Sequence, residues 1–206
     1  MRNRHIALTA LGCALALSGY ATPPAATAQE APRSPAKLVS SRVSLAGTSN
    51  IHAYTASTTA ARIVRLQAAD GALLDALLTP GTVEAFEISI PAATLSSPKE
   101  GIDKNMHKAL KAAEHPDITF RLSRLGEADA TGAMRAVGVL RIAGVEREVV
   151  LALRTRRTDS QLTVTGEVQL LMTDFGVTPP KAMLGMLKTD PKVTVTFEAV
   201  FGVPLT

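Results

Sequence analysis

The residues best suited to chemistry in this sequence are three histidines beyond the N-terminal segment: His52, His107 and His115. Zinc sites on a helix commonly use two histidines four residues apart, whereas His107 and His115 are eight apart. A metal site would need His52 to join one of them, with Asp103 or Asp117 as a further ligand. Surface or turn histidines are the simpler interpretation, so we expect no metal and no cofactor. A metal-assisted enzyme stays an alternative hypothesis.

Other common catalytic patterns are missing from the sequence. No serine lies in a G-x-S-x-G motif, and no glycine-rich loop precedes a helix where it could bind phosphate. No local pair of carboxylates singles out a general acid and a general base. The single cysteine, Cys13, lies in the N-terminal segment. We therefore expect no catalytic residues and a protein that is not an enzyme.

The first 28 residues have the pattern of a secretory signal peptide. Arg2 and Arg4 precede an apolar run at 6–17 that is too short to span a bilayer, and the small residues at 26–28 form a cleavage site. We expect cleavage near Gln29 and export to the periplasm. A retained membrane anchor and lipidation of Cys13 are the competing interpretations.

The exported part of the chain would be one domain with a small net charge. Residues 29–37 are predicted to be a flexible leader, and residues 38–206 form one domain by their length. Without the arginines of the signal peptide, the formal net charge falls from +4 to about +2. Since tryptophan is absent and aromatic residues are few, a base-stacking surface is not expected either. We expect no nucleic-acid partner, and without Cys13 no disulfide.

Apolar residues recur at every second position from Leu38 onward, which predicts β-strands with one apolar and one polar face. Such strands form an antiparallel sheet covered on one side, and eight of them can close into a barrel or stack as a sandwich. About eight strands are predicted, near residues 39–45, 61–66, 86–90, 118–122, 140–142, 145–153, 162–170 and 193–197.

Two short helices are predicted between these strands. The first begins near Asp103 and places Met106 and Leu110 on its apolar side, and the second covers residues 178–188. On the first helix, three lysines at 104, 108 and 111 form a stripe that could touch anionic lipid head groups, although a solvated helix face is the commoner meaning. Any contact with a membrane surface is expected to be transient.

Several motifs, taken in order, resemble the YceI-like family of exported lipocalin-like proteins. They extend from about Ser41 to Phe201 and read GTSNIHAY, GIDKNMHKALKAAEHPDITFRL, GVLRIAGVEREVVLAL, DFGV and MLGMLKTDPKVTVTFEAVF. The resemblance implies an all-β protein with short helices, built as an eight-stranded antiparallel lipocalin-like β-barrel with a deep apolar interior. Some members bind a polyisoprenoid chain, and catalytic residues are not generally assigned. One departure is that Ala53 and Tyr54 stand where members often carry an acidic and an aromatic residue.

The resemblance and the alternation together predict a ligand-binding interior. The expected partner is a long-chain isoprenoid lipid, such as an isoprenoid quinone or a polyprenyl chain, which the protein would carry or buffer in the periplasm. A filled-core barrel that acts at its surface, as an envelope stress or interaction protein, is an alternative; the sequence indicates no oligomeric state. The predicted lining is Phe86, Ile88, Phe120, Leu140, Leu151, Leu170, Val195 and Phe197, with Phe175, Met183 and Met186 at the mouth.

Overall fold

The computed structural model describes residues 36–68, 74–182 and 186–202. These residues all belong to one compact unit, Pro32–Thr206. The predicted signal peptide lies outside the described residues, as does the predicted leader apart from its last two positions. Among the described residues, we find no helix with the length and hydropathy needed to cross a membrane.

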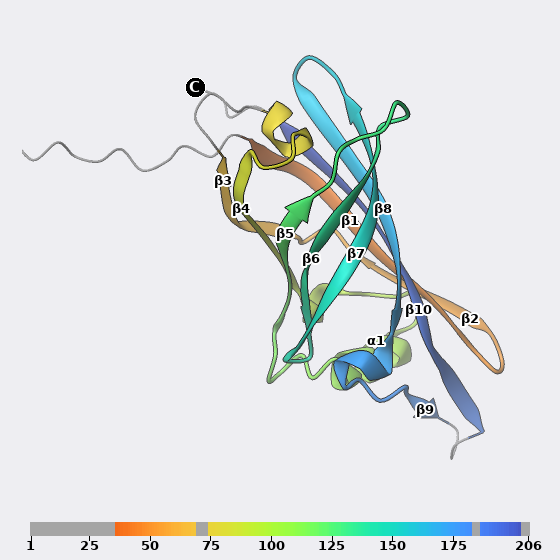
Figure 1. The fold of residues 1–206 in the computed structure, drawn as a ribbon. Helices are drawn as coiled ribbons and strands as arrows, with labels where there is room; N and C mark the ends of the chain where they lie inside the picture. Colours follow the sequence, from red (N-terminus) through yellow and green to blue (C-terminus); the bar gives the residue numbers. More distant parts are fainter. Residues whose placement is uncertain (1–35, 69–73, 183–185, 203–206) are drawn as a thin grey trace, which may run out of the picture. The chain divides into compact units, whose positions relative to one another are not determined.

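Antiparallel β-strands make up most of the described chain (Figure 1). One α-helix and three short 3-10 helices connect them within the described ranges. In chain order the elements are β1 (Lys37–Ser49), β2 (Ala53–Thr58), β3 (Arg62–Ala68), η1 (Leu74–Leu78), β4 (Val83–Pro91), η2 (Ala92–Thr94), α1 (Glu100–Ala109), β5 (Asp117–Leu125), β6 (Ala133–Ile142), β7 (Val145–Arg157), β8 (Gln161–Leu171), η3 (Met172–Phe175), β9 (Lys181–Ala182) and β10 (Leu187–Gly202).

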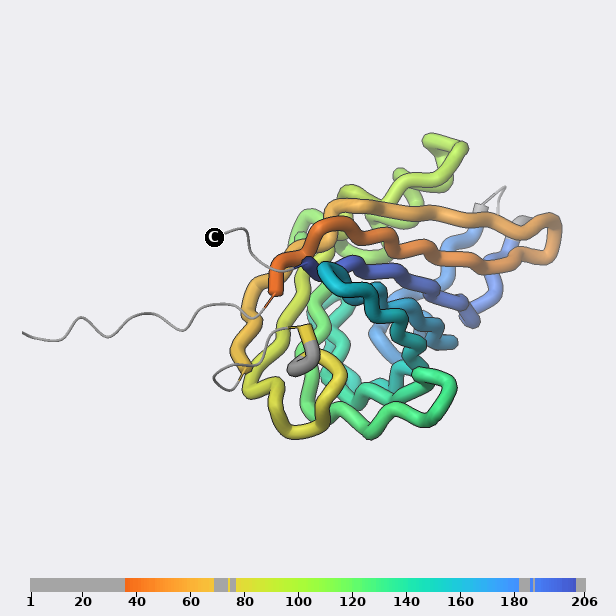
Figure 2. The backbone as a smooth tube through the Cα atoms, turned by 90° about the horizontal axis from the view of Figure 1, so that it is seen from above, coloured from red at the N-terminus to blue at the C-terminus, as the bar shows by residue number. Residues whose placement is uncertain are grey.

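The strands form one curled sheet in the order β2-β1-β10-β8-β7-β6-β5-β4-β3, with β9 paired to the start of β10 (Figure 2). The first and last strands of this order, β2 and β3, are separated in the chain by residues 59–61 alone. A connection of three residues therefore joins the two edge strands of the sheet. The predicted barrel fold is confirmed, with two strands more than predicted. These are the threonine- and alanine-rich β2, which lacks a clear apolar alternation, and the two-residue β9.

The connection between β6 and β7 is a two-residue turn, in agreement with the predicted strand bounds 140–142 and 145–153. Ile142 pairs with Val145, and both residues between them have positive φ, 49° at Ala143 and 82° at Gly144. Two positive φ angles define the type I′ turn, whose twist matches that of the flanking strands. A side chain at Gly144 would also meet the ring of His115, with 2.6 Å between its Cβ and the ring atoms. Glycine suits this position on both grounds.

Helix α1 lies where the sequence predicts it and packs through its apolar side. Met106 is buried against Ala56 and Leu95, which attaches the helix to β2 and to the segment after η2. The helix begins at Glu100, three residues before Asp103, whose carboxylate accepts a hydrogen bond from the Ser97 amide at 2.8 Å. The helix thus holds the loop that leads into it.

The second predicted helix, over residues 178–188, is wrong for the residues that the structure describes. Lys181–Ala182 is the short strand β9, and β10 begins at Leu187. Asn50 in the β1–β2 turn explains this outcome, because its backbone N–H donates to Lys188 O at 3.1 Å and its Oδ1 accepts from the Lys188 amide at 2.8 Å. The Asn50 Nδ2 also donates to Met186 O at 2.8 Å. These hydrogen bonds join residues that are 136 and 138 positions apart in the chain. They hold the segment in an extended conformation in spite of its helical pattern of apolar residues.

Candidate functional site

A cavity of about 750 Å³ lies inside the curled sheet, and most of its lining side chains are apolar. Its volume falls within the usual range of ligand pockets, roughly 300–1,000 Å³. Along β1 the lining extends from Ser41 to Ser49. At about 3.3 Å per residue this segment is roughly 26 Å long, so the cavity is elongated along the strands.

Nine of the eleven predicted site residues line this cavity: Phe86, Ile88, Phe120, Leu140, Leu151, Leu170, Phe175, Val195 and Phe197. Of the two others, Met186 is 66% exposed at the start of β10 and is not part of the lining. Met183 lies outside the described residues. Contact between the nine residues and a ligand remains a prediction.

Sequence reasoning missed lining residues of two kinds. Some continue an alternation already recognised, such as Leu153 after Leu151 and Val168 before Leu170. Others come from α1 and the residue that follows it, since Met106 and Leu110 line the cavity as well as packing the helix. The apolar side of the predicted helix was the available signal for these.

One end of the cavity is closed by apolar packing. Leu74 of η1 is fully buried in a cluster with Leu66, Leu162 and Phe201. Leu77 of the same 3-10 helix packs against this cluster and also lines the cavity. The cluster therefore forms the floor of the cavity.

The other end is where exposed side chains also line the cavity. Most of the exposed lining residues lie there: His52 after the β1–β2 turn, Lys99 before α1, Gly101 and Asn105 within it, Leu171 at the end of β8 and Lys181 in β9. Glu198, which pairs with Arg42 and Thr165, is exposed further along the wall. The two views show the β1–β2 turn, α1 and β9 at one end of the sheet, opposite η1 (Figures 1 and 2). A residue that is both exposed and in the lining marks where the interior reaches solvent, so this end is the mouth.

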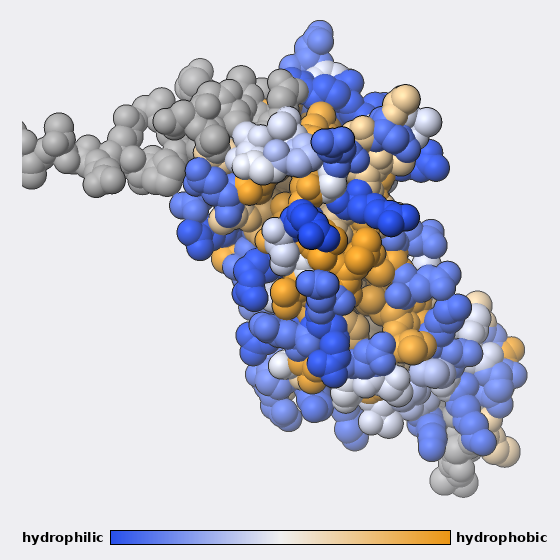
Figure 3. Space-filling view, in the orientation of Figure 1, coloured by the Kyte–Doolittle hydropathy of each residue, from blue (hydrophilic) through white to orange (hydrophobic). Residues whose placement is uncertain are grey.

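The wall of the sheet is split on one side near the mouth. Strand β7 pairs with β8 only between Ala152 and Arg157, so its first half is bonded to β6 alone. Three lining residues, Leu151, Val168 and Leu170, flank the split. Figure 3 shows apolar side chains gathered in the middle of this face, between rims of polar residues.

Tyr54 is the one lining residue with a buried polar atom that lacks a partner among the described residues. It pairs with Gly47 of β1, and a Cβ at Gly47 would be only 2.3 Å from the tyrosine hydroxyl. The ring therefore lies over the glycine. Burial raises the pKa of Tyr54 above its ordinary value of 10.0, and the negative charge of Asp190 raises this pKa further.

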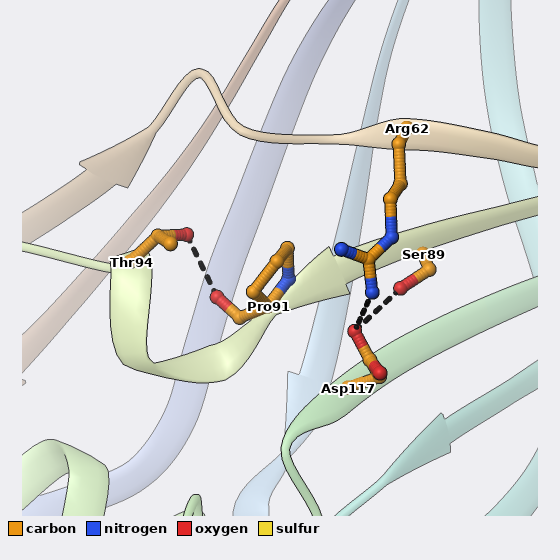
Figure 4. A network of polar contacts seen from close by, with 5 residues as sticks. All are labelled: Arg62, Ser89, Pro91, Thr94 and Asp117. Carbon is orange, nitrogen blue, oxygen red and sulfur yellow. Dashed lines mark hydrogen bonds and ion pairs between the residues drawn. The ribbon is translucent and has the colours of Figure 1, made fainter.

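A polar network outside the cavity holds the corner between β3, β4 and β5 (Figure 4). Asp117 Oδ1 accepts hydrogen bonds from Arg62 Nη2 at 2.8 Å and from the Ser89 hydroxyl at 2.7 Å. Ser89 is 2% exposed, so Asp117 satisfies a buried hydroxyl. At η2, the Thr94 hydroxyl donates to Pro91 O at 2.7 Å. None of these five residues lines the cavity, so the network has a structural role.

The three candidate metal-binding histidines lie apart. His52 is exposed at the mouth, the His107 ring Nε2 is 2.8 Å from Leu95 O, and His115 packs on the β6–β7 turn. Within the described ranges, no group of three or more histidine, cysteine or acidic side chains could hold a metal ion.

A curled antiparallel sheet around an apolar interior, with a packed floor and an exposed mouth, defines a lipocalin-like β-barrel. The chain belongs to the YceI-like family, because the model of the YceI-like domain matches residues 38–201. The search of curated proteins finds no match.

Solved structures of low sequence identity share this fold. BcnA of Burkholderia cenocepacia is 14% identical, with a TM-score of 0.62 over 78% of this chain and 95% of BcnA. A polyisoprenoid binding domain from Saccharophagus degradans, implicated in plant cell wall breakdown, is 13% identical, with a TM-score of 0.56 over 84% of this chain and all of that domain (100%). The Campylobacter jejuni YceI protein is 16% identical, with a TM-score of 0.53 over 70% of this chain and 85% of its own.

Proposed function

We propose that this protein binds a long apolar lipid inside its barrel and acts as a non-enzymatic carrier or buffer for it. The observation that carries the proposal is the elongated apolar cavity of about 750 Å³ with a closed floor and an exposed mouth. A polyisoprenoid or an isoprenoid quinone fits this shape, and the similar domain from Saccharophagus degradans is named for polyisoprenoid binding.

The physical basis of binding is the transfer of the chain out of water. Burial of apolar surface contributes roughly 25 cal/mol per Å², so a long hydrocarbon chain gains affinity without specific polar contacts. Leucine, valine and isoleucine predominate in the lining, beside a few phenylalanines such as Phe120 and Phe197. Such a surface follows a flexible aliphatic chain and discriminates poorly between chains of similar length.

The periplasm is the proposed location, on the strength of the N-terminal signal pattern. An apolar ligand has negligible solubility in water, so a carrier has to meet a membrane to load and release it. We propose a transient contact made by the mouth, where segments 99–111, 181–182 and 186–192 carry seven of the chain's eight lysines against three acidic residues. Ile51 and Met186, both exposed, lie at the same end.

Native mass spectrometry tests the proposal directly. Protein expressed in a bacterial host should carry a co-purifying lipid, and protein stripped of it should take up an added prenyl lipid with one-to-one stoichiometry. A bare protein mass together with no uptake of added lipid would contradict the proposal.

The two alternatives have less support. A filled-core barrel needs apolar side chains that meet in the centre, whereas these side chains surround a cavity. A metal-assisted enzyme needs the three histidines close together, and they lie at three different places.

A further inference from the structure

The split in the wall arises because β7 and β8 each follow their other neighbour. The first half of β7 stays paired with β6, and the end of β8 stays paired with β10 as far as Leu171. Between β7 and β8 the last pair towards the mouth is Ala152↔Glu167. Figure 1 shows the two strands separating towards the end of the sheet that carries α1. In this described part of the chain, no backbone pair joins residues 145–151 to residues 168–171.

Apolar side chains border the split on both faces of the sheet. Leu151, Val168 and Leu170 line the cavity. On the outer face Val150 is 54% exposed, and Leu171, which also lines the cavity, is 43% exposed. Because an exposed lining residue marks where the interior meets solvent, the cavity reaches the surface at the split.

Packed elements limit the split at both of its ends. The ladder that starts at Ala152 closes one end. At the other end, Phe175 of η3 and Val177 are buried in a cluster against which Val145 of β7 packs. Residues 168–171, which lie between these limits, span roughly 13 Å at about 3.3 Å per residue. A hydrocarbon chain is about 4 Å thick, judged by the contact distance of its carbon atoms, so the split is long enough to pass one.

This split is also the part of the wall that separates at the lowest cost. Other neighbouring strands of the sheet are joined by backbone hydrogen bonds, which would have to break. The two edge strands, β2 and β3, are not paired, but Ser57 of β2 exchanges backbone hydrogen bonds with Ser96 at 2.8 and 3.0 Å. At the split, apolar side chains move apart instead, and a hydrocarbon that passes between them replaces the contacts that they lose.

We propose that the lipid chain enters and leaves the cavity sideways, through the split between β7 and β8. This inference rests on the proposed function and adds the route that the lipid takes. A chain that enters from the side stays against apolar groups such as Val150 and Leu171. Threading through the mouth would instead draw its whole length past polar side chains, including Lys99 and Lys181.

A cross-link across the split tests this route. The register of the ladder, continued from Ala152↔Glu167, places Val150 opposite Gln169, and both are exposed on the outer face. A short bismaleimide linker joins Val150→Cys to Gln169→Cys in lipid-free protein. The single cysteine of the chain, Cys13, lies in the predicted signal peptide, so the processed protein offers no competing thiol.

The matched control carries the same linker within the intact ladder, between Arg154→Cys and Thr165→Cys. Stopped-flow fluorescence with a fluorescent prenyl lipid measures uptake and release. We expect the linker across the split to slow both rates by roughly tenfold or more and to leave the equilibrium affinity unchanged, because it blocks a route and not the site. The control should keep the rates of the wild type.

The outcomes separate the route from the proposed function. If the protein linked across the split takes up lipid at the rate of the wild type, the route is wrong while lipid binding stands. Equal slowing in the control would also contradict the route, since any stiffening of the sheet would then suffice. If the wild type binds no lipid, the proposed function fails and the route fails with it.

A pair of single substitutions tests the route without a linker. Val150 and Val64 are similarly exposed, at 54% and 57%, but Val64 lies on β3, which β4, β5 and β6 separate from β7. Val150→Asp should slow uptake about threefold, because a passing hydrocarbon has to desolvate the carboxylate. Val64→Asp should leave uptake unchanged. Equal rates in the two variants would contradict passage beside Val150.

Discussion

At the scale of single residues, the direction of a side chain decides whether it belongs to the interior. Alternation in the sequence was sufficient to predict that Phe120, Leu140 and Val195 point into the cavity, because each lies in a strand with regular apolar spacing. It was not sufficient for Tyr54, whose inward position depends on a glycine in the neighbouring strand. Pairing between strands is a long-range property, and a single sequence does not display it. Met186, predicted at the mouth, lies at that end of the sheet, where its backbone carbonyl accepts a hydrogen bond from Asn50 and its side chain is exposed and not part of the lining.

Adjacent residues of β8 provide a matched test of the interior. Val168 lines the cavity, and Gln169 is exposed on the opposite face. We expect Val168→Trp to reduce lipid uptake at least tenfold by filling the cavity, and Gln169→Trp to leave uptake unchanged. Titration with a fluorescent prenyl lipid measures both, with circular dichroism as the control for folding. Equal effects of the two variants would argue against an interior site.

Tyr54 also predicts how stability changes at high pH. Its folded pKa is raised, so the folded state holds the phenolic proton more tightly than the unfolded state. The stabilisation is complete below the ordinary pKa of 10.0 and is lost as pH rises through the folded value. Urea unfolding between pH 9 and pH 11 should therefore show a loss of stability that is smaller in Tyr54→Phe. An identical pH dependence in the two proteins would refute the raised pKa.

At the scale of elements, local sequence was a good guide to strands and a poorer one to boundaries. The regular strands and the β6–β7 turn follow from spacing and turn chemistry. The second helix does not form as predicted, because pairing with β1 extends β10 through Pro191. This proline lies between Gly47↔Val193 and Ser49↔Thr189, where the register shifts, and precedes the first pair with β8 at Lys192. Its missing N–H therefore interrupts no ladder there.

The stability of the corner between β3, β4 and β5 should depend on Asp117 more than on Arg62. Asp117→Ala leaves the buried Ser89 hydroxyl without its acceptor, at a cost of about 1–3 kcal/mol. Arg62→Ala removes an exposed ion pair, which is worth about 0–1 kcal/mol. Urea unfolding measures both free energies. A larger loss for Arg62→Ala than for Asp117→Ala would show that the ion pair, and not the buried hydroxyl, stabilises this corner.

At the scale of the whole molecule, the two ends of the cavity differ in character. Apolar packing around η1 closes one end, while the other end carries seven lysines and the exposed Ile51 and Met186. The sequence alone predicted a lysine stripe on the first helix. That these lysines and β9 lie together at the mouth could be seen only in the folded structure. The cavity itself, its volume and its closed floor, also depended on how distant segments pack.

This asymmetry predicts that the protein binds anionic membranes through its mouth. A basic residue near an anionic surface contributes about 1 kcal/mol, so replacement of Lys181, Lys188 and Lys192 by alanine should weaken binding at least tenfold. Sedimentation with vesicles that contain phosphatidylserine measures the change, and added salt should weaken binding of the wild type. The matched control replaces Arg121, Arg124 and Arg135, three exposed arginines on β5 and β6. Equal losses in the two triple variants would indicate attraction by net charge without a docking end.

Interior binding is tested by photo-crosslinking with a prenyl lipid that carries a diazirine along its chain, followed by peptide mass spectrometry. We expect adducts at inward residues such as Phe120, Leu140 and Val195, and none at their outward neighbours Arg121, Arg141 and Thr196. Adducts confined to the outward residues, or spread evenly over both faces, would contradict an interior binding site.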